Sequence, residues 1–128
     1  MINLKTVQRV NPLDTGAPKK YYVSTQSAGE VTLEEMSELI SEKCTLTETD
    51  VLAALNALTK EMTTHLMNGK IVRFGTFGSF QLGLSSIGVD TEEETSRLQV
   101  KGVRVRFRPG RRIEDSLLRL KYSLTAKQ

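Results

Sequence analysis

The segment from 102 to 108 constrains the fold most, because apolar and basic side chains alternate strictly along it. Successive side chains of a β-strand point to opposite faces of the sheet, so this alternation predicts a strand with one apolar and one basic face. The apolar face would carry Val103, Val105 and Phe107, and the basic face would carry Arg104, Arg106 and Arg108. Three arginines on one face repel one another unless an anion lies there, and guanidinium groups suit phosphate oxygens. The alternative is a solvated basic face.

The charge of the chain is unevenly distributed, although the formal net charge is only +3. Residues 31 to 69 contain seven acidic and two basic side chains. Residues 101 to 128 contain nine basic and two acidic side chains. This asymmetry indicates a polyanionic partner at the basic end, whereas the alternative is a charged surface that only faces solvent.

Composition excludes several classes of protein. The chain has 128 residues, of which 38% are hydrophobic and 26% charged, and this fits one domain with at most one appendage. No apolar run approaches the roughly 20 residues of a membrane helix, and the N-terminus lacks the apolar region of a secretory signal. Cys44 is the only cysteine, so no internal disulfide can form. We expect Cys44 in the core and the protein in the cytoplasm.

No enzyme chemistry is expected from the motifs. The sequence offers no glycine-rich phosphate loop, no nucleophile–base pair and no cluster of metal ligands. His65 has no second His or Cys near it in the sequence, so it is expected on the surface rather than at a metal. We therefore expect neither catalysis nor a cofactor.

Two helices are expected in the acidic part of the chain. Thr32 and Glu35 have the spacing of a capping box, and a helix with an apolar stripe follows them. Thr47 would cap a second, longer helix that ends at Asn68-Gly69. The first stripe comprises Leu33, Met36, Leu39, Ile40 and Cys44, and the second comprises Val51, Leu55, Leu58, Met62 and Leu66. The two would form an acidic helical hairpin whose apolar surface exceeds what one short sheet can cover, so a second copy is expected to bury it.

Strands are expected on both sides of these helices. Residues 1 to 31 indicate a strand, a turn rich in Pro and Gly, and a second strand. An isolated β-hairpin is marginal in water, so it should dock on the main sheet or on another chain. After the helices we expect strands over 70–74 and 79–85, an arm over 86–100, the basic strand, and a helix from Arg111 to about Lys121. The predicted fold is α+β, with a helical hairpin, a three-stranded antiparallel sheet, a β-arm and a C-terminal helix.

Two short motifs, in this order, resemble the histone-like HU/IHF family of bacterial DNA-bending proteins. Residues 76–80 read Thr-Phe-Gly-Ser-Phe, which is similar to the family's turn with Thr in place of its first Gly. Residues 107–111 read Phe-Arg-Pro-Gly-Arg, which is similar to the end of its last strand and the start of its last helix. The resemblance covers roughly residues 31 to 121. It predicts an HU/IHF-like DNA-binding domain over 32–124, preceded by a β-hairpin extension of a variant branch over 1–31 and followed by a flexible tail over 125–128.

The resemblance implies an intertwined homodimer, in which the helices form a base and two β-arms embrace DNA. Such a protein binds duplex DNA mainly through phosphates with little sequence specificity, bends it and helps to organise the nucleoid. Carried over to matching positions, the expected phosphate contacts are Thr76, Gly78 and Ser79 in the turn and Arg108, Gly110 and Arg111 at the helix start. In the family the sheets form a saddle over the helices. The charges of this sequence add Arg73, Lys101, Arg104 and Arg106 along that saddle, and Arg112 at the helix start.

The arm departs from the family's pattern. The family's arm is basic and has a proline at its tip, whereas residues 85–100 contain no proline, four acids between Asp90 and Glu94, and Arg97 as the only base. DNA repels a negative tip, so deep insertion and strong kinking are not expected. The acidic run could instead begin a short helix with Asp90 as its cap. The alternative function is an HU-like dimer that binds a protein partner through this acidic arm or the N-terminal hairpin.

Overall fold

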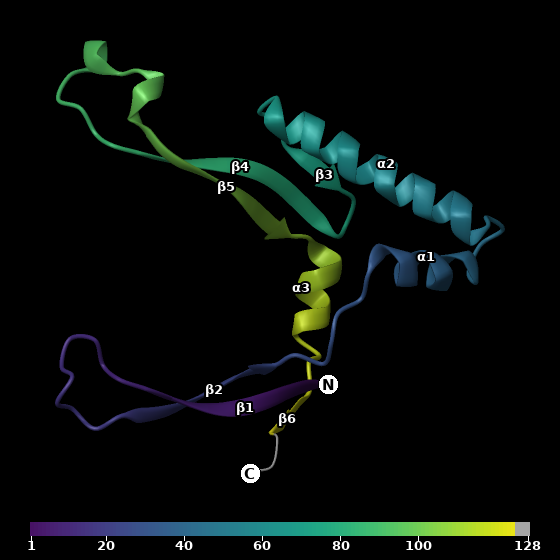
Figure 1. The fold of residues 1–128 in the computed structure, drawn as a ribbon, viewed down its shortest axis with the longest axis horizontal. Coiled ribbons are helices and arrows are strands. Elements are labelled where there is room, and N and C mark those ends of the chain that lie inside the picture. Colours follow the sequence, from purple (N-terminus) through teal and green to yellow (C-terminus); the bar gives the residue numbers. More distant parts are fainter. Residues whose placement is uncertain (125–128) are drawn as a thin grey trace. The chain divides into compact units, whose positions relative to one another are not determined.

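The computed structural model describes residues 1–124 and divides the chain into two compact units (Figure 1). One unit combines Met1–Thr32 with the segment that begins at Leu117, and the other is Leu33–Ser116. Each unit contains one three-stranded sheet, so the α+β class predicted from the sequence is confirmed. The predicted tail over 125–128 lies outside the described residues. Across the described part, no helix has the length and apolar character needed to span a membrane.

The first unit is built on the predicted N-terminal hairpin. Strand β1 (Ile2–Arg9) pairs antiparallel with β2 (Lys20–Gln26), which confirms the hairpin. A third strand, β6 (Tyr122–Leu124), pairs parallel with the other edge of β1, giving the order β2-β1-β6. The amide of Ile2 also donates to the carbonyl of Lys121 at 2.8 Å. The hairpin therefore docks on the C-terminal part of its own chain.

The C-terminal helix is shorter than the sequence predicted, because strand β6 follows it. Helix α3 spans Arg111–Leu117, whereas the sequence predicted a helix to about Lys121. The spacing of apolar residues up to Leu120 is helical, but the chain leaves the helix so that β6 can pair with the free edge of β1. Pairing that edge satisfies backbone groups of β1 that a two-stranded hairpin would leave open.

The second unit begins with helices α1 (Leu33–Ser41) and α2 (Glu48–Met67), which contact each other. The Thr47 hydroxyl accepts from the amide of Asp50 at 3.2 Å, which confirms the predicted cap. Gly69 follows α2 with a φ of 78°, a left-handed conformation that glycine adopts without strain. The predicted stripe of α2 lies on its more buried side, with Val51 and Leu66 buried.

The prediction for Cys44 was wrong. It lies beyond the end of α1 and is exposed, because the chain turns between the two helices and the apolar stripe does not continue. Within residues 1–124, Val51 and Leu66 are the only buried apolar side chains. One copy of the chain thus has a very small core.

The sheet of the second unit has the order β3-β4-β5 and is antiparallel throughout. Its strands are β3 (Val72–Phe74), β4 (Gly78–Ser86) and β5 (Val100–Pro109), close to the ranges predicted from the sequence. Helix α2 contacts β3 and β4. Two single 3₁₀ turns, η1 (Glu92–Glu94) and η2 (Arg97–Gln99), lie in the connection between β4 and β5.

Candidate nucleic-acid interface

The strand register gathers the predicted basic residues on one face of the β3-β4-β5 sheet. Ser79 of β4 lies opposite both Arg73 of β3 and Arg108 of β5. Further along β4, Gln81 lies opposite Arg106 and Gly83 lies opposite Arg104. Directly opposed residues share a face, as do residues two apart on one strand. We call the four residues Arg73, Arg104, Arg106 and Arg108 the arginine face.

The arginine face has only neutral neighbours on β4. The Nη1 group of Arg104 donates to the Ser85 hydroxyl at 3.0 Å. The side chain of Arg106 lies across Gly83, since a Cβ atom added to that glycine would come within 2.5 Å of the Arg106 Nε. Throughout the described residues, no carboxylate forms an ion pair with any member of the arginine face. The positive charges of the four guanidinium groups are therefore left to an anion or to solvent.

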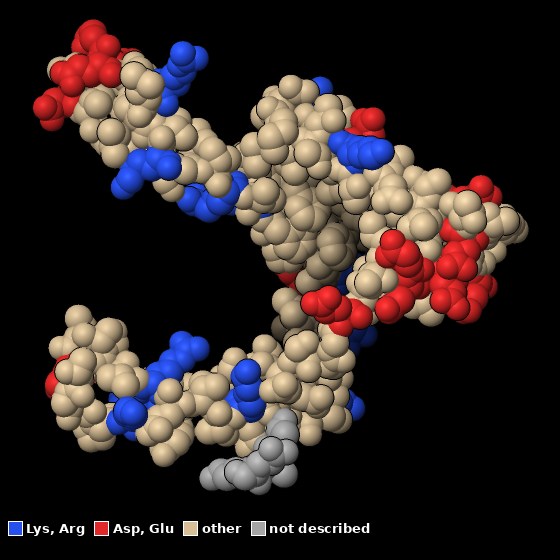
Figure 2. All heavy atoms as spheres, viewed as in Figure 1, with Lys and Arg blue, Asp and Glu red and all other residues tan. Residues whose placement is uncertain are grey.

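A hollow of about 400 Å³ lies at this face. It is lined by Ile71, Arg73, Ser79, Gln81, Arg106, Phe107 and Arg108. All four members of the arginine face are exposed. Figure 2 shows basic side chains along the β4–β5 ribbon and acidic side chains gathered at its far end. The arrangement presents positive charge on an open surface, which suits an extended polyanion better than a small buried ligand.

The predicted turn packs directly against the start of α3. The amide of Gly110 donates to the Phe77 carbonyl at 2.8 Å, and the amide of Arg112 donates to the Thr76 carbonyl at 3.2 Å. The Arg112 Nε also donates to the Thr76 hydroxyl at 3.4 Å. These two amides and this hydroxyl are already engaged within the chain. The amides of Gly110 and Arg112 therefore hold the start of α3 against the turn of the same chain.

The two motif glycines have steric roles. A Cβ atom on Gly110 would collide with the Thr76 carbonyl. A Cβ atom on Gly78, whose φ is 154°, would collide with the Phe107 ring and the carbonyl of Arg108. Only glycine lets the turn approach the end of β5 and the start of α3 so closely. The turn therefore fixes where β5 ends and where the exposed Arg111 emerges.

Lys101 is placed differently from the arginines. The register shifts between Ser85 and Ser86, which pair with Gly102 and Val100, so Lys101 is the extra residue of a β-bulge. Alternation along β5 cannot assign it to the arginine face. It is exposed, and it lies where the sheet ends and the arm begins.

Comparison with known proteins gives the family. A family model described as an HU domain fused to wHTH, Ig or a glycine-rich motif, HU-HIG, matches residues 1–123. This chain belongs to the HU-HIG family. The predicted likeness to HU proteins is confirmed, and the match also takes in the N-terminal hairpin, which the motifs alone did not reach.

One solved structure supports the fold of the HU-HIG chain. It is a 2.25 Å crystal structure of a candidate bacterial DNA-binding protein from Bacteroides vulgatus ATCC 8482, with a TM-score of 0.64 and 10% sequence identity. The alignment covers 98% of the HU-HIG chain and 49% of that chain. The HU-HIG chain thus spans about half the length of this structural relative. A comparison with curated proteins gave no match.

The arm of the HU-HIG chain ends in a folded tip. Backbone hydrogen bonding from the Ile87 amide to the Gln99 carbonyl, at 2.9 Å, closes its base, and the Gln99 side-chain amide donates to the Ile87 carbonyl at 2.7 Å. The acidic run does form a helical turn, η1, but its cap position is Thr91, so the prediction of Asp90 as the cap was wrong. Thr91 makes no side-chain capping bond.

Sequence reasoning missed the second turn of the arm, η2. Ser96 and Gln99 form a capping box, in which the Ser96 amide donates to the Gln99 side chain at 2.8 Å. The Ser-x-x-Gln spacing is the usual signal for this motif and was available in the sequence. Sequence reasoning also missed that β4 places a neutral residue opposite each arginine of the arginine face.

Proposed function

We propose that the HU-HIG chain binds duplex DNA mainly through its phosphates, with little sequence selectivity, as a nucleoid-associated histone-like protein. The observation that carries this proposal is the arginine face, which is exposed and has no carboxylate partner among the described residues. Guanidinium groups bind phosphate oxygens in a forked geometry, whereas sequence readout needs side chains that enter a groove and contact base edges. Family membership and the fold of the Bacteroides vulgatus relative support DNA as the polyanion.

We also infer that the binding form is a homodimer. The face of the sheet opposite the arginines carries a row of neighbouring, mutually tilted phenylalanine rings, with Phe80 and Phe107 centroids 4.9 Å apart and Phe77 and Phe107 centroids 5.5 Å apart. Phe74, Phe77 and Phe107 are each more than 40% exposed. Val103 and Val105 beside them are about 60% exposed. Such a continuous apolar surface indicates a protein interface.

The small core of the single chain leads to the same conclusion. A core of two buried apolar side chains cannot offset the conformational entropy of more than a hundred ordered residues. We call Phe74, Phe77, Phe80 and Phe107 the phenylalanine row. A second copy covering this row would bury the apolar area that one copy leaves exposed.

We propose that bending by this protein is mild. The arm has no proline, and its most exposed apolar side chain, Leu98, follows the three carboxylates of Glu92, Glu93 and Glu94. Minor-groove kinking requires an apolar side chain to unstack a base step, and phosphates repel carboxylates. DNA contacts would then concentrate on the arginine face.

A salt titration tests the proposed function. Binding to duplexes of about 30 base pairs should weaken steeply with salt, because each neutralised phosphate contributes about −0.9 to the slope of log affinity on log salt. The double change Arg104→Gln/Arg106→Gln should reduce the magnitude of that slope by about 1.8. The matched control is Lys43→Gln/Lys60→Gln, which removes two exposed charges from the helical region. Absence of binding at low salt, or equal effects of both variants, would contradict the proposal.

A further inference from the structure

A second basic surface lies on the small sheet of the first unit. The described residues of that unit contain six Lys and Arg side chains and only two acids, Asp14 and Glu30. Asp14 is in the loop between β1 and β2, where its carboxylate accepts from the Gly16 amide at 3.1 Å. Glu30 follows β2. Neither acid belongs to a strand of the sheet.

The register sorts the hairpin into two faces. Lys5 lies opposite Ser24, Val7 opposite Tyr22, and Arg9 opposite Lys20, so these six residues share one face. No acid occurs on that face along either strand. The other face carries mainly apolar and hydroxyl side chains, among them Leu4, Thr6, Tyr21, Val23 and Thr25. The sheet is thus amphipathic, with its cations on one side.

The cations of this face are poorly explained by the fold alone. Arg9 and Lys20 stand directly opposite each other, and like charges in that position destabilise a strand pair. Neither forms an ion pair within the described residues. Both are exposed, and Tyr22 beside them is 49% exposed. A bound anion would remove this repulsion.

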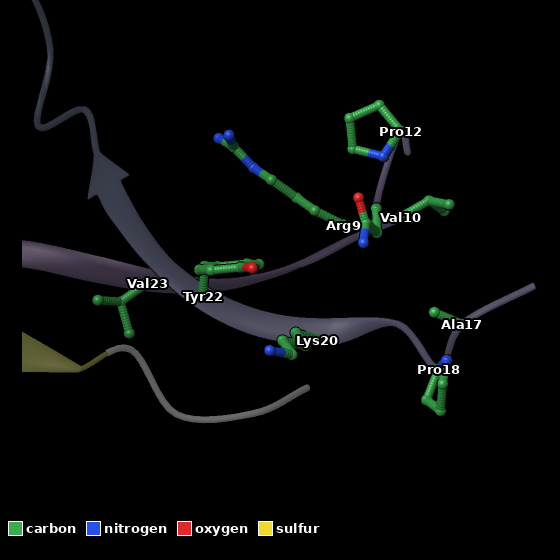
Figure 3. A pocket seen from close by; sticks show the side chains of 9 residues that line it. Arg9, Val10, Pro12, Ala17, Pro18, Lys20, Tyr22 and Val23 are labelled. Atoms are coloured by element: carbon green, nitrogen blue, oxygen red, sulfur yellow. The ribbon is translucent and has the colours of Figure 1, made fainter. Parts of the chain in front are cut away.

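A hollow of about 650 Å³ lies at this end of the hairpin. Figure 3 shows that its lining side chains come from both strands and from both ends of the connecting loop. Arg9, Lys20 and Tyr22 are among them, so two cationic groups and one phenol border the same space. Ammonium, guanidinium and phenol groups all donate hydrogen bonds, which is the chemistry that phosphate oxygens require.

We propose that Lys5, Arg9, Lys20 and Tyr22 form a second phosphate-binding surface, which contacts the backbone of duplex DNA independently of the arginine face. The proposal rests on the proposed function in one respect, since the partner is the same polyanion. It assigns a role to the N-terminal hairpin, namely to add phosphate contacts rather than only to complete a sheet.

The test compares two double variants in the full chain. Arg9→Gln/Lys20→Gln should reduce the magnitude of the salt slope for duplex binding by about 1.8, because two phosphate contacts are lost. Its matched control, Lys43→Gln/Lys60→Gln, also removes two positive charges from exposed positions, one just after α1 and one on α2. This control should leave the slope unchanged. The hairpin variant relieves a repulsion, so its thermal midpoint should be equal to or higher than that of the unchanged protein.

The two double variants distinguish DNA binding by the hairpin from DNA binding by the arginine face. If Arg104→Gln/Arg106→Gln leaves binding unchanged while the hairpin variant weakens it, the second surface binds DNA and the arginine face does not. If the hairpin variant binds like the unchanged protein while its fold is intact, the second surface is overturned. If the hairpin and control variants lose affinity equally, net charge accounts for the loss and the second surface is again overturned.

Discussion

Gly110 and Gly102 lie close in sequence but in different surroundings, which makes them a matched pair at the residue scale. We expect Gly110→Ala to lower the free energy of unfolding by about 1–3 kcal/mol, because the new methyl group collides with the Thr76 carbonyl. Gly102 has open space around it. Gly102→Ala should therefore change stability by less than about 1 kcal/mol. Urea unfolding of both variants checks this, and equal losses would contradict the steric role of Gly110.

Single residues were predictable where their role depends on near neighbours in the sequence. The Thr47 cap needs only the amide of Asp50, three residues on, and it was found. The common face of Arg104, Arg106 and Arg108 follows from alternation along one strand, and it was also found. Cys44 was misjudged because its position depends on where a helix stops, and the bulge at Lys101 was not foreseen. Neither feature has a strong local signal.

The charge of the arm tip gives a prediction at the scale of an element. We expect Glu92→Gln/Glu93→Gln/Glu94→Gln to tighten duplex binding several-fold at about 0.05 M salt, because three carboxylates no longer repel phosphates. The gain should shrink at about 0.2 M salt, where screening is stronger. The control is Glu34→Gln/Glu38→Gln/Glu42→Gln in and just after α1. An equal gain in both variants would show that only net charge matters.

Elements were predictable when their pattern was long. The helix over Glu48–Met67 and the strand over Val100–Pro109 were found from periodicity, with errors of one or two residues at their ends. Strand β6 was missed because Tyr122–Leu124 is too short to show a period and is strand only through its pairing with β1. The same tertiary effect shortened α3.

The phenylalanine row gives a prediction for the whole molecule. If a second copy covers Phe74, Phe77 and Phe107, folding and association are coupled, and the thermal midpoint should rise with protein concentration. Thermal unfolding over about a hundredfold range of concentration measures this shift. The change Val105→Lys should lower both the midpoint and the dimer fraction seen in sedimentation. A monomer whose midpoint is independent of concentration would contradict the inferred homodimer.

The family could be predicted from two motifs, while the architecture of the complete molecule could not. The motifs lie in residues 76–80 and 107–111, where backbone geometry restricts the residue types. The joining of the N-terminal hairpin to the C-terminal segment has no such signature, because it depends on contacts between residues more than a hundred positions apart.

That long-range pairing has a consequence for biosynthesis. Strand β1 leaves the ribosome well before its parallel partner β6, because the whole second unit lies between them in the sequence. The whole of Leu33–Ser116 is therefore available to fold before the first sheet can be completed. Closing so large a loop is slow, and it is faster once the intervening chain is compact. The order of translation thus favours assembly of the arginine-bearing sheet before the N-terminal sheet is completed.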